Sequence, residues 1–362
     1  MFFKTPLYEE HLKLKAHMDN FAGWIMPINY IGALREARNV RENCGIFDIS
    51  HMSRIVVEGK DATKFLNKLV AKDVIHAVEN RMFGPTALLN YNGGFIDDIM
   101  LYKFSEERYM IVGNAINRFK DMDWLKNHID EEVVNIYDCT EKLGMLAIQG
   151  PRTFELIGKH CSIDLDSLKI LEYRRNVEIF GINVFLISRS GWTGEKGVEI
   201  ICNNDKIIDL WRKIIALGIK PAGLACRDVL RIEMGFCLYG NDIDEKTTPL
   251  EARYWVFDLY KEEYIGREKI WSQYINGIDR IRIGVRMKKK TPIPRHGSKI
   301  MVDGKIVGEI TSGTHSPTLN RNIGIGYIDT RHAINGLPIQ VDIRGRKFDG
   351  KIVEPLFITP RW

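Results

Sequence analysis

Apolar and polar positions follow two different periods along this chain of 362 residues. In residues 32–45, GALREARNVRENCG, the apolar positions recur at helical spacing and predict a helix, which Gly45 is placed to end. A second helical pattern, DATKFLNKLV, begins at Asp61, whose carboxylate can cap the first turn. A third predicted helix, AINRFKDMDWLKNHI, begins at Ala115.

Between these helices the pattern changes to short apolar runs bounded by turn residues, such as SRIVVEGK and RYMIVGN, which are typical of strands. Hairpins and helices alternate irregularly, which favours an α+β fold over a regular parallel winding of strands and helices. From about Ile281 onward, short strands with glycine turns, such as KIMVDGKIVGEITSG, predict a small β-barrel or sandwich domain.

One predicted strand carries two adjacent carboxylates. In YNGGFIDDIMLY, residues 91–102, Asp97 and Asp98 follow a glycine turn inside an otherwise apolar run. An unpaired buried charge is costly, so the pair needs a structural or a chemical reason. Consecutive side chains of a strand point to opposite faces, and only one of the two can therefore face a given cavity. The spacing alone does not say which one.

Composition narrows the possible functions. Hydrophobic residues make up 45% of the chain and charged residues 27%, as in ordinary soluble domains. The chain has no apolar run of about 18 residues and no signal-peptide pattern, so we expect a cytoplasmic protein without a membrane span. The net charge of +5 is scattered along the chain, and no nucleic-acid-binding module accompanies it.

Metal and nucleotide chemistry also find no support in the sequence. The six cysteines show no C-x-x-C pair, the nine histidines show no H-E-x-x-H motif, and no phosphate-binding glycine loop is present. We therefore predict no metal site. One basic cluster, RMKKKTPIPRHGSK at residues 286–299, is either a solvated loop at a domain junction or a surface that docks an acidic carrier protein.

Taken together, several stretches resemble the aminomethyltransferase family, the T-protein of the glycine cleavage system, and they occur in the order of that family. They are TPLYEEH, FAGWIMPINY, GIFDISHM, GGFIDDIMLY, AIQGP, SRSGWTGEKGVEI, GLACRDVLRIEMG, LYGNDIDEKTTPLEA and GEITSGTHSPTL. The resemblance implies an α+β, three-domain cloverleaf around a central folate cavity. Its expected parts are a folate-binding domain (1–50 and 140–240), a second α/β domain (51–139 and 241–278) and a C-terminal β-barrel (279–362).

The resemblance also implies a reaction. In the family, an aminomethyl group rides on the dihydrolipoyl arm of a carrier, the H-protein. Ammonia leaves, and the one-carbon unit passes to tetrahydrofolate as the 5,10-methylene form. An ionised carboxylate suits this chemistry, because it can stabilise the developing positive charge and accept or orient a proton.

Site residues follow from the matching motifs. The resemblance places Asp97, the first acid of the I-D-D stretch, beside the reactive part of tetrahydrofolate and places Arg227 where folate and the lipoyl arm meet. Glu195 resembles the acid that binds the pterin ring of folate. The remaining expected folate contacts are Met52, Asn114, Trp192 and Tyr239.

Three departures from the family pattern fall in these motifs and are expected around the cavity. Pro85 stands where tyrosine is usual, Asn241 replaces a glutamine, and Arg253 replaces a glycine. They keep open a second reading, a tetrahydrofolate-dependent demethylase of a small methylated amine or sulfonium compound. Two further readings are a non-catalytic folate-binding protein and a folate module that works with a separate flavoprotein chain.

Overall fold

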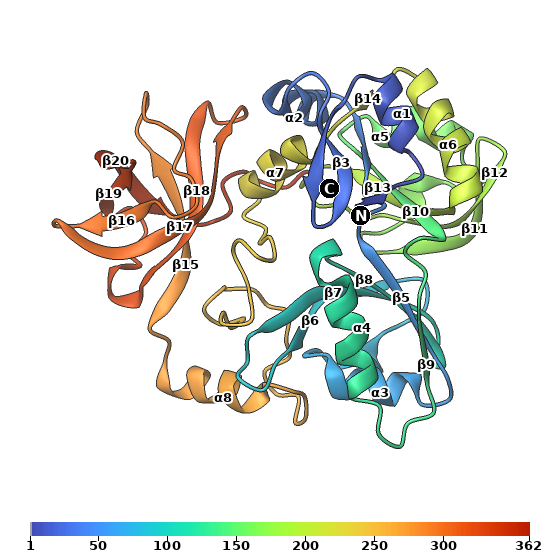
Figure 1. Ribbon diagram of the computed structural model, residues 1–362, viewed down its shortest axis with the longest axis horizontal. Helices are drawn as coiled ribbons and strands as arrows, with labels where there is room; N and C mark the ends of the chain where they lie inside the picture. The colour runs from blue at the N-terminus through green and yellow to red at the C-terminus, as the bar shows by residue number, and fades with distance from the viewer. Residues whose placement is uncertain (1) are drawn as a thin grey trace.

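The computed structural model describes residues 2–362 and has three lobes, with the β-barrel lying to one side of two α/β lobes (Figure 1). The first lobe is built on a six-stranded sheet with the order β11-β12-β13-β10-β4-β14. Its strands are β4 (Gly45–Asp48), β10 (Leu143–Gln149), β11 (Tyr173–Ile179), β12 (Ile182–Ser188), β13 (Gly197–Asn203) and β14 (Lys220–Pro221). A small sheet of β1 (Phe3–Lys4), β3 (Trp24–Asn29) and β2 (His17–Phe21) joins the same lobe.

Alternation along β10 explains why helices cover both faces of this sheet. Leu146 and Ile148 point into a core shared with Trp211 of α6 (Asn204–Ala216) and with α5 (Thr153–Ile157). Met145 and Ala147 point the other way, into a core completed by α2 (Ala33–Glu42) and α7 (Leu224–Glu233). The short helix α1 (Tyr8–Lys13) precedes β2.

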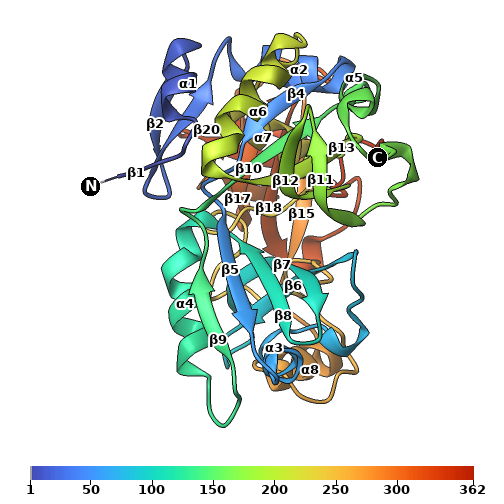
Figure 2. The same ribbon diagram turned by 90° about the vertical axis from the view of Figure 1, so that its right-hand side faces the viewer.

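The second lobe is a five-stranded sheet with the order β6-β7-β8-β5-β9 (Figure 2). Its strands are β5 (Ser53–Glu58), β6 (Met82–Leu89), β7 (Phe95–Ser105), β8 (Arg108–Gly113) and β9 (Asn135–Asp138). Ile99 and Leu101 of β7 join the core beneath α3 (Ala62–Leu69) and α4 (Arg118–Asn127), whereas Met100 and Tyr102 face the first lobe. The two faces of β7 therefore contribute side chains to two different hydrophobic cores.

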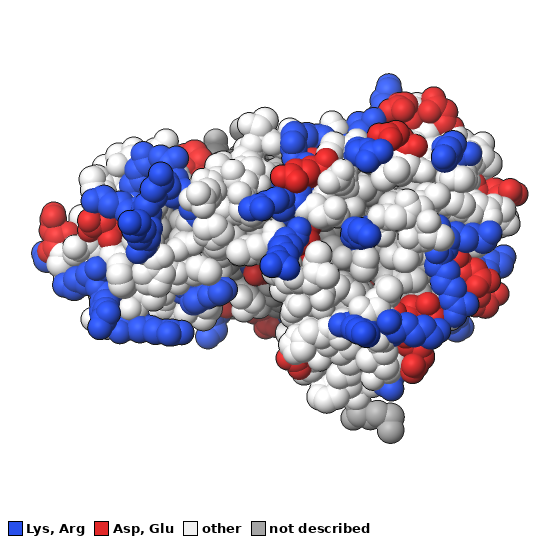
Figure 3. All heavy atoms as spheres, turned by 90° about the horizontal axis from the view of Figure 1, so that it is seen from above, with Lys and Arg blue, Asp and Glu red and all other residues white. Residues whose placement is uncertain are grey.

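The third lobe is a closed barrel with the order β15-β18-β17-β16-β19-β20, reached through α8 (Arg267–Asn276). Its strands are β15 (Arg280–Met287), β16 (Lys299–Val302), β17 (Lys305–Ser316), β18 (Arg321–Asp329), β19 (Pro338–Ile343) and β20 (Arg346–Val353). The basic cluster at residues 286–299 forms the end of β15 and the loop that leads to β16, where Lys288, Lys289 and Lys290 are exposed. Lys and Arg side chains are prominent on the barrel end of the molecule in Figure 3.

The fold confirms the expected α+β class and the C-terminal barrel. The domain boundaries stay a prediction, and each predicted domain contains one of the three large sheets. One predicted helix end is wrong, and a second is right in position but lacks the expected capping bond. Gly45 does not end α2, because the helix stops at Glu42, the cap position is Asn43, and Gly45 already opens β4. Asp61 holds the predicted N-cap position of α3, but its carboxylate makes no bond to the helix and accepts the backbone N–H of Val133.

The chain crosses between the two α/β lobes at residues 49–52 and again at 139–142, and one buried arginine holds both crossings. Arg54 is fully buried, and its Nη2 atom donates to the carbonyl oxygens of Ser50, Thr140 and Leu143 at 2.9, 2.5 and 2.6 Å. Its Nη1 atom donates to the carbonyl of Met52. Four backbone carbonyls at the two crossings are thus bonded to one guanidinium.

Replacing Arg54 should therefore destabilise the junction of the two lobes. We expect Arg54→Met to lower the free energy of unfolding by about 3 kcal/mol or more, because several buried carbonyls lose their donor. Urea unfolding measures the difference, with the exposed Arg38→Met as the matched control. A loss below about 1 kcal/mol would contradict this role for Arg54.

Candidate active site

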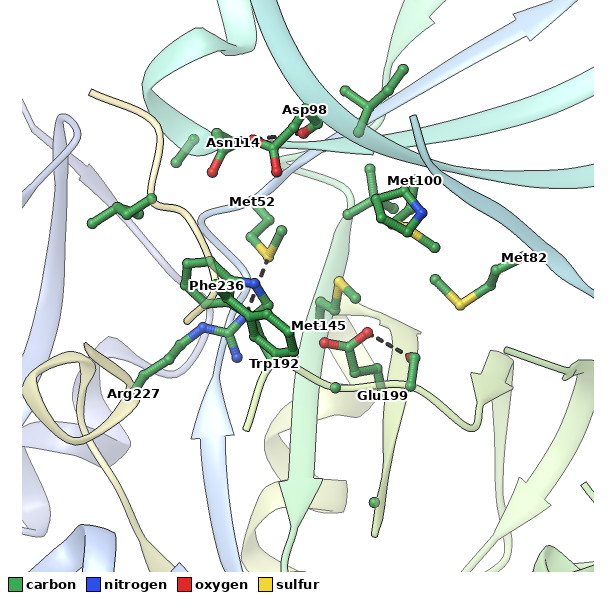
Figure 4. Close-up of a pocket in the computed structure, with 18 of the residues that line it drawn as sticks. Met52, Met82, Asp98, Met100, Asn114, Met145, Trp192, Glu199, Arg227 and Phe236 are labelled. Carbon is green, nitrogen blue, oxygen red and sulfur yellow. Dashed lines mark hydrogen bonds between the residues drawn. The ribbon is translucent and has the colours of Figure 1, made fainter. Parts of the chain in front are cut away.

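A cavity of about 640 Å³ lies between the two α/β lobes (Figure 4), and its wall also contains residues of the segment that follows α7 and Trp362. Its wall combines apolar side chains with a few charged groups, the composition expected of a site for a small organic ligand. Four methionines contribute flexible apolar surface: Met52, Met82, Met100 and Met145.

Strand β7 presents one of its two adjacent acids to this cavity. Asp98 lies in the cavity wall, as Met100 does two residues later, whereas Asp97 is 0% exposed and lies on the opposite face of the strand. The expectation that Asp97 faces the cavity is thus corrected to Asp98. The alternation argument holds, but the resemblance selected the wrong member of the pair.

Asp98 is held by two donors. Asn114, which follows β8, donates from Nδ2 to Oδ1 of Asp98 at 2.8 Å, and the hydroxyl of Tyr254 donates to Oδ2 at 3.1 Å. Burial, together with the negative charge of Asp97, raises the pKa of Asp98 to about 7. The carboxyl group can therefore give or take a proton near neutral pH.

On the other side of the cavity, Arg227 of α7 is buried and lies over the ring of Trp192, with 5.1 Å between the guanidinium carbon and the ring centroid. Its Nη1 atom has no hydrogen-bond partner among residues 2–362, and its Nη2 atom lies 4.0 Å from the sulfur of Met52. Burial lowers the pKa of Arg227. A buried guanidinium with an open donor suits a ligand that brings an acceptor.

Glu195 lies at the centre of a buried ionic network. Its Oε1 atom accepts from Nη1 of Arg41 at 2.9 Å and from Nη2 of Arg361 at 2.5 Å. Arg41 also pairs with Glu233 of α7 at 2.8 Å, and Glu233 accepts from the hydroxyl of Ser316 in the barrel. The Oε2 atom of Glu195 has no donor within the described chain, so one acceptor in the cavity wall remains open.

Several charged or titratable residues of the cavity wall were missed from the sequence, and Glu199 and His51 are two of them. Glu199 of β13 accepts from the hydroxyl of Ser190 at 2.6 Å. His51 is buried, and burial together with the nearby Arg227 and Arg54 lowers the pKa of His51 to about 3 and keeps its ring neutral. Glu199 carried the same signal as the aspartate pair, an acid inside an apolar strand, GVEIIC.

The structure brings together five of the predicted site residues. The cavity wall contains Met52, Asn114, Trp192, Glu195 and Arg227. Tyr239 does not belong to this wall, because its hydroxyl donates to the carbonyl of Phe95 at 3.1 Å and accepts from Lys120. The tyrosine that does line the cavity is Tyr254.

The three departures from the family pattern separate in space. Pro85 and Asn241 line the cavity, as expected. Arg253 does not, because its Nη2 atom pairs with Glu354 at 2.7 Å, and the expectation for that residue is corrected. Within the described residues no group of three His, Cys, Asp or Glu side chains is arranged to hold a metal ion. No helix from residue 2 to residue 362 is long and apolar enough to cross a bilayer.

Two α/β lobes with a largely apolar cavity between them, and a barrel packed beside them, define a multidomain α+β protein with a candidate ligand site between lobes. Family models identify the particular class: the GCVT N-terminal domain matches residues 7–259, and the glycine cleavage T-protein C-terminal barrel domain matches residues 280–358. The chain belongs to the glycine cleavage T-protein family of aminomethyltransferases.

Individual relatives agree over the full length. The aminomethyltransferase of Caldanaerobacter subterraneus subsp. tengcongensis is 40% identical, with 98% of this chain and 95% of the relative covered. That of Thermoanaerobacter pseudethanolicus is 38% identical, with 98% and 97% covered. The crystal structure of glycine cleavage system aminomethyltransferase T from Bartonella henselae superposes with a TM-score of 0.93 at 30% identity, covering 100% and 99%. The expected family, fold class and aminomethyltransferase activity are confirmed, and the alternative functions are not favoured.

The raised pKa of Asp98 predicts a stability cost at neutral and alkaline pH. The folded-state pKa of about 7 exceeds the unfolded value of 3.8, so the folded protein binds a proton more tightly, and stability falls as the pH rises between these values. We expect Asp98→Asn to be more stable than the native chain above pH 7, by on the order of 3 kcal/mol, and equal to it below pH 4. Urea unfolding at pH 4 and pH 8 checks this. The exposed Asp123→Asn should show no such difference, and equal stability of Asp98→Asn and the native chain at pH 8 would contradict it.

Proposed function

We propose that the cavity binds tetrahydrofolate and that the enzyme transfers the aminomethyl carbon from the dihydrolipoyl arm of H-protein to it, with release of ammonia and formation of 5,10-methylene-tetrahydrofolate. The observation that carries the proposal is the position of Asp98, a carboxyl group that titrates near neutral pH and faces the unpaired guanidinium side of the same cavity. The family of the chain supplies the reaction class.

The open polar groups of the wall fit a reduced pterin. A pterin ring has neighbouring N–H donors and a carbonyl acceptor, and it stacks on apolar or aromatic surfaces. The free Oε2 atom of Glu195 can accept one N–H group, and the free Nη1 atom of Arg227 can donate to the carbonyl. Because Oε1 of Glu195 already accepts from Arg41 and Arg361, this acid offers one acceptor to a ligand. Trp192 provides the aromatic surface.

In this proposal tetrahydrofolate supplies the nucleophilic nitrogens that receive the one-carbon unit. Asp98 does the protein's part of the chemistry. As a carboxylate, it stabilises the positive charge that develops at the carbon when ammonia leaves, and it accepts the proton that the attacking amine loses. Asn114 and Tyr254 hold its two oxygens in place, so little reorganisation is needed. Asp97 influences Asp98 from the buried face of β7, because its negative charge contributes to the raised pKa of Asp98.

The partner and the location of the enzyme belong to the same proposal. The arm of H-protein enters between the two α/β lobes and brings its aminomethyl group to Asp98, and the basic surface of the barrel offers a docking face for an acidic carrier. We place the reaction in the cytoplasm. Small methylated amines and sulfonium compounds are the competing donors, and the assay below discriminates them.

The test is direct. The purified chain, aminomethyl-loaded H-protein and tetrahydrofolate should give ammonia and methylene-tetrahydrofolate in equal amounts. Omission of tetrahydrofolate is the control. Should the chain bind tetrahydrofolate and yet release no ammonia from loaded H-protein, the H-protein part of the proposal is wrong and small methylated donors become the candidates.

Asp98→Asn keeps the shape of the side chain and removes its charge. We expect kcat to fall about 10²–10⁴-fold, the range for loss of a general acid–base group, while the Kd for tetrahydrofolate changes little. Single-turnover kinetics and equilibrium binding separate the two effects. Asp123→Asn on the exposed side of α4 should behave like the native enzyme. Native turnover in Asp98→Asn would remove Asp98 from the mechanism.

A further inference from the structure

A third acid lies behind the pair on β7, and the reaction as proposed does not use it. Asp121 of α4 is 0% exposed. Neither of its carboxyl oxygens accepts a hydrogen bond from any residue that the structure describes. An ionised carboxylate without a single donor is very costly in such a place.

The side chain beside Asp121 is Asp97. A Cβ atom placed on Gly113 would stand 2.7 Å from Oδ2 of Asp97 and 3.1 Å from Oδ2 of Asp121, so the two oxygens flank one small space that the glycine leaves free. The carboxyl groups are close enough to share a proton. If both carboxyl groups were ionised, these neighbouring charges would repel each other strongly, because little water screens them in the protein interior.

The donors around the pair are distributed unequally. Asp97 accepts from the backbone N–H of Asn114 at 2.9 Å and from the side-chain amides of Asn114 and Asn117 at 2.8 and 2.5 Å. Asp121 has none of these bonds. Hydrogen bonds to the charged form favour ionisation, so Asp97 is built to be the anion. Burial and the charge of Asp97 raise the pKa of Asp121 well above its usual value.

Among the described residues, no nearby cation favours Asp121 over Asp97 as the ionised acid. Lys120, the neighbour of Asp121 on α4, directs its ammonium group to the hydroxyl of Tyr239 at 2.5 Å and to Glu245 at 3.0 Å. The other titratable groups that face the acids are Tyr239, Tyr254, which donates to Asp98, and the buried thiol of Cys237. Burial raises the pKa of all three groups, so none supplies a counter-charge.

We propose that Asp121 is a positioning residue that remains a neutral carboxylic acid and donates its proton in a hydrogen bond to Asp97. This bond completes the set of donors around Asp97 and fixes its negative charge directly behind Asp98. The charge in turn keeps the pKa of Asp98 near neutrality. The part of this inference that concerns turnover rests on the proposed function, whereas the protonation state of Asp121 does not.

The protonation state can be measured without any substrate. The infrared spectrum of the native protein at neutral pH should contain the carbonyl stretch of a buried carboxylic acid, and Asp121→Asn should lose it. Asp123→Asn on the same helix is the matched control and should retain the band. If Asp121→Asn loses no carboxylic acid band, Asp121 is ionised and the inference is overturned, whether or not the chain turns over H-protein.

Two substitutions at position 121 test the role in turnover. Asp121→Asn retains an N–H donor toward Asp97, so we expect kcat within about twofold of native and an unchanged acid limb of the pH profile. Asp121→Leu removes the donor, so Asp97 takes up a proton, and the acid limb should move to lower pH by roughly one pH unit or more. A native profile in a folded Asp121→Leu protein, or the same displacement in both variants, would refute the positioning role. If Asp121→Leu does not fold, Asp121→Asn and the infrared measurement still decide.

Discussion

The position of the barrel against the first lobe depends on one buried guanidinium, that of Arg41. Arg41 bonds with Glu195 and Glu233, and these acids bond in turn with Arg361 near the C-terminus and with Ser316 of the barrel. Removing one member of such a network would leave an uncompensated charge inside the protein, and this penalty makes the arrangement specific even where its net contribution to stability is small. The network therefore fixes the first lobe, the barrel and the chain end relative to one another.

The same network prepares the cavity. Since the arginines use only Oε1 of Glu195, the second oxygen remains open and is held rigidly in the wall. On the opposite wall of the cavity the acids are not paired with cations that the structure describes. Within residues 2–362, Asp97, Asp98 and Asp121 have no hydrogen bond or ion pair with an arginine or lysine, and amide and hydroxyl donors hold the first two. One wall is thus neutralised by cations, and the other retains carboxyl groups whose ionisation is costly but chemically useful.

Much of the architecture could be predicted because it depends on local periodicity. The helix in residues 32–45, the strand that carries the acid pair and the strand-rich tail all follow from the spacing of apolar residues. Helix ends were less predictable. Gly45 is needed at the start of β4, where a Cβ atom would meet Val40 at 2.6 Å, and Asp61 bonds with a distant backbone N–H group in preference to its own helix. Tertiary contacts, and not the neighbouring helix, determine the role of both residues.

For the site, the sequence determined which residue types are present and that Asp97 and Asp98 must face opposite ways, because strand geometry is local. It did not determine which of them meets the cavity, since that depends on how β7 packs between the helices of its own lobe and the first lobe. Nor could it separate Tyr239 from Tyr254, or Arg253 from Asn241, because loops place these four side chains by long-range contacts. Only the tertiary structure decided that Asp98 faces the cavity while Asp97 and Asp121 lie behind it, buried and without a counter-ion among the described residues.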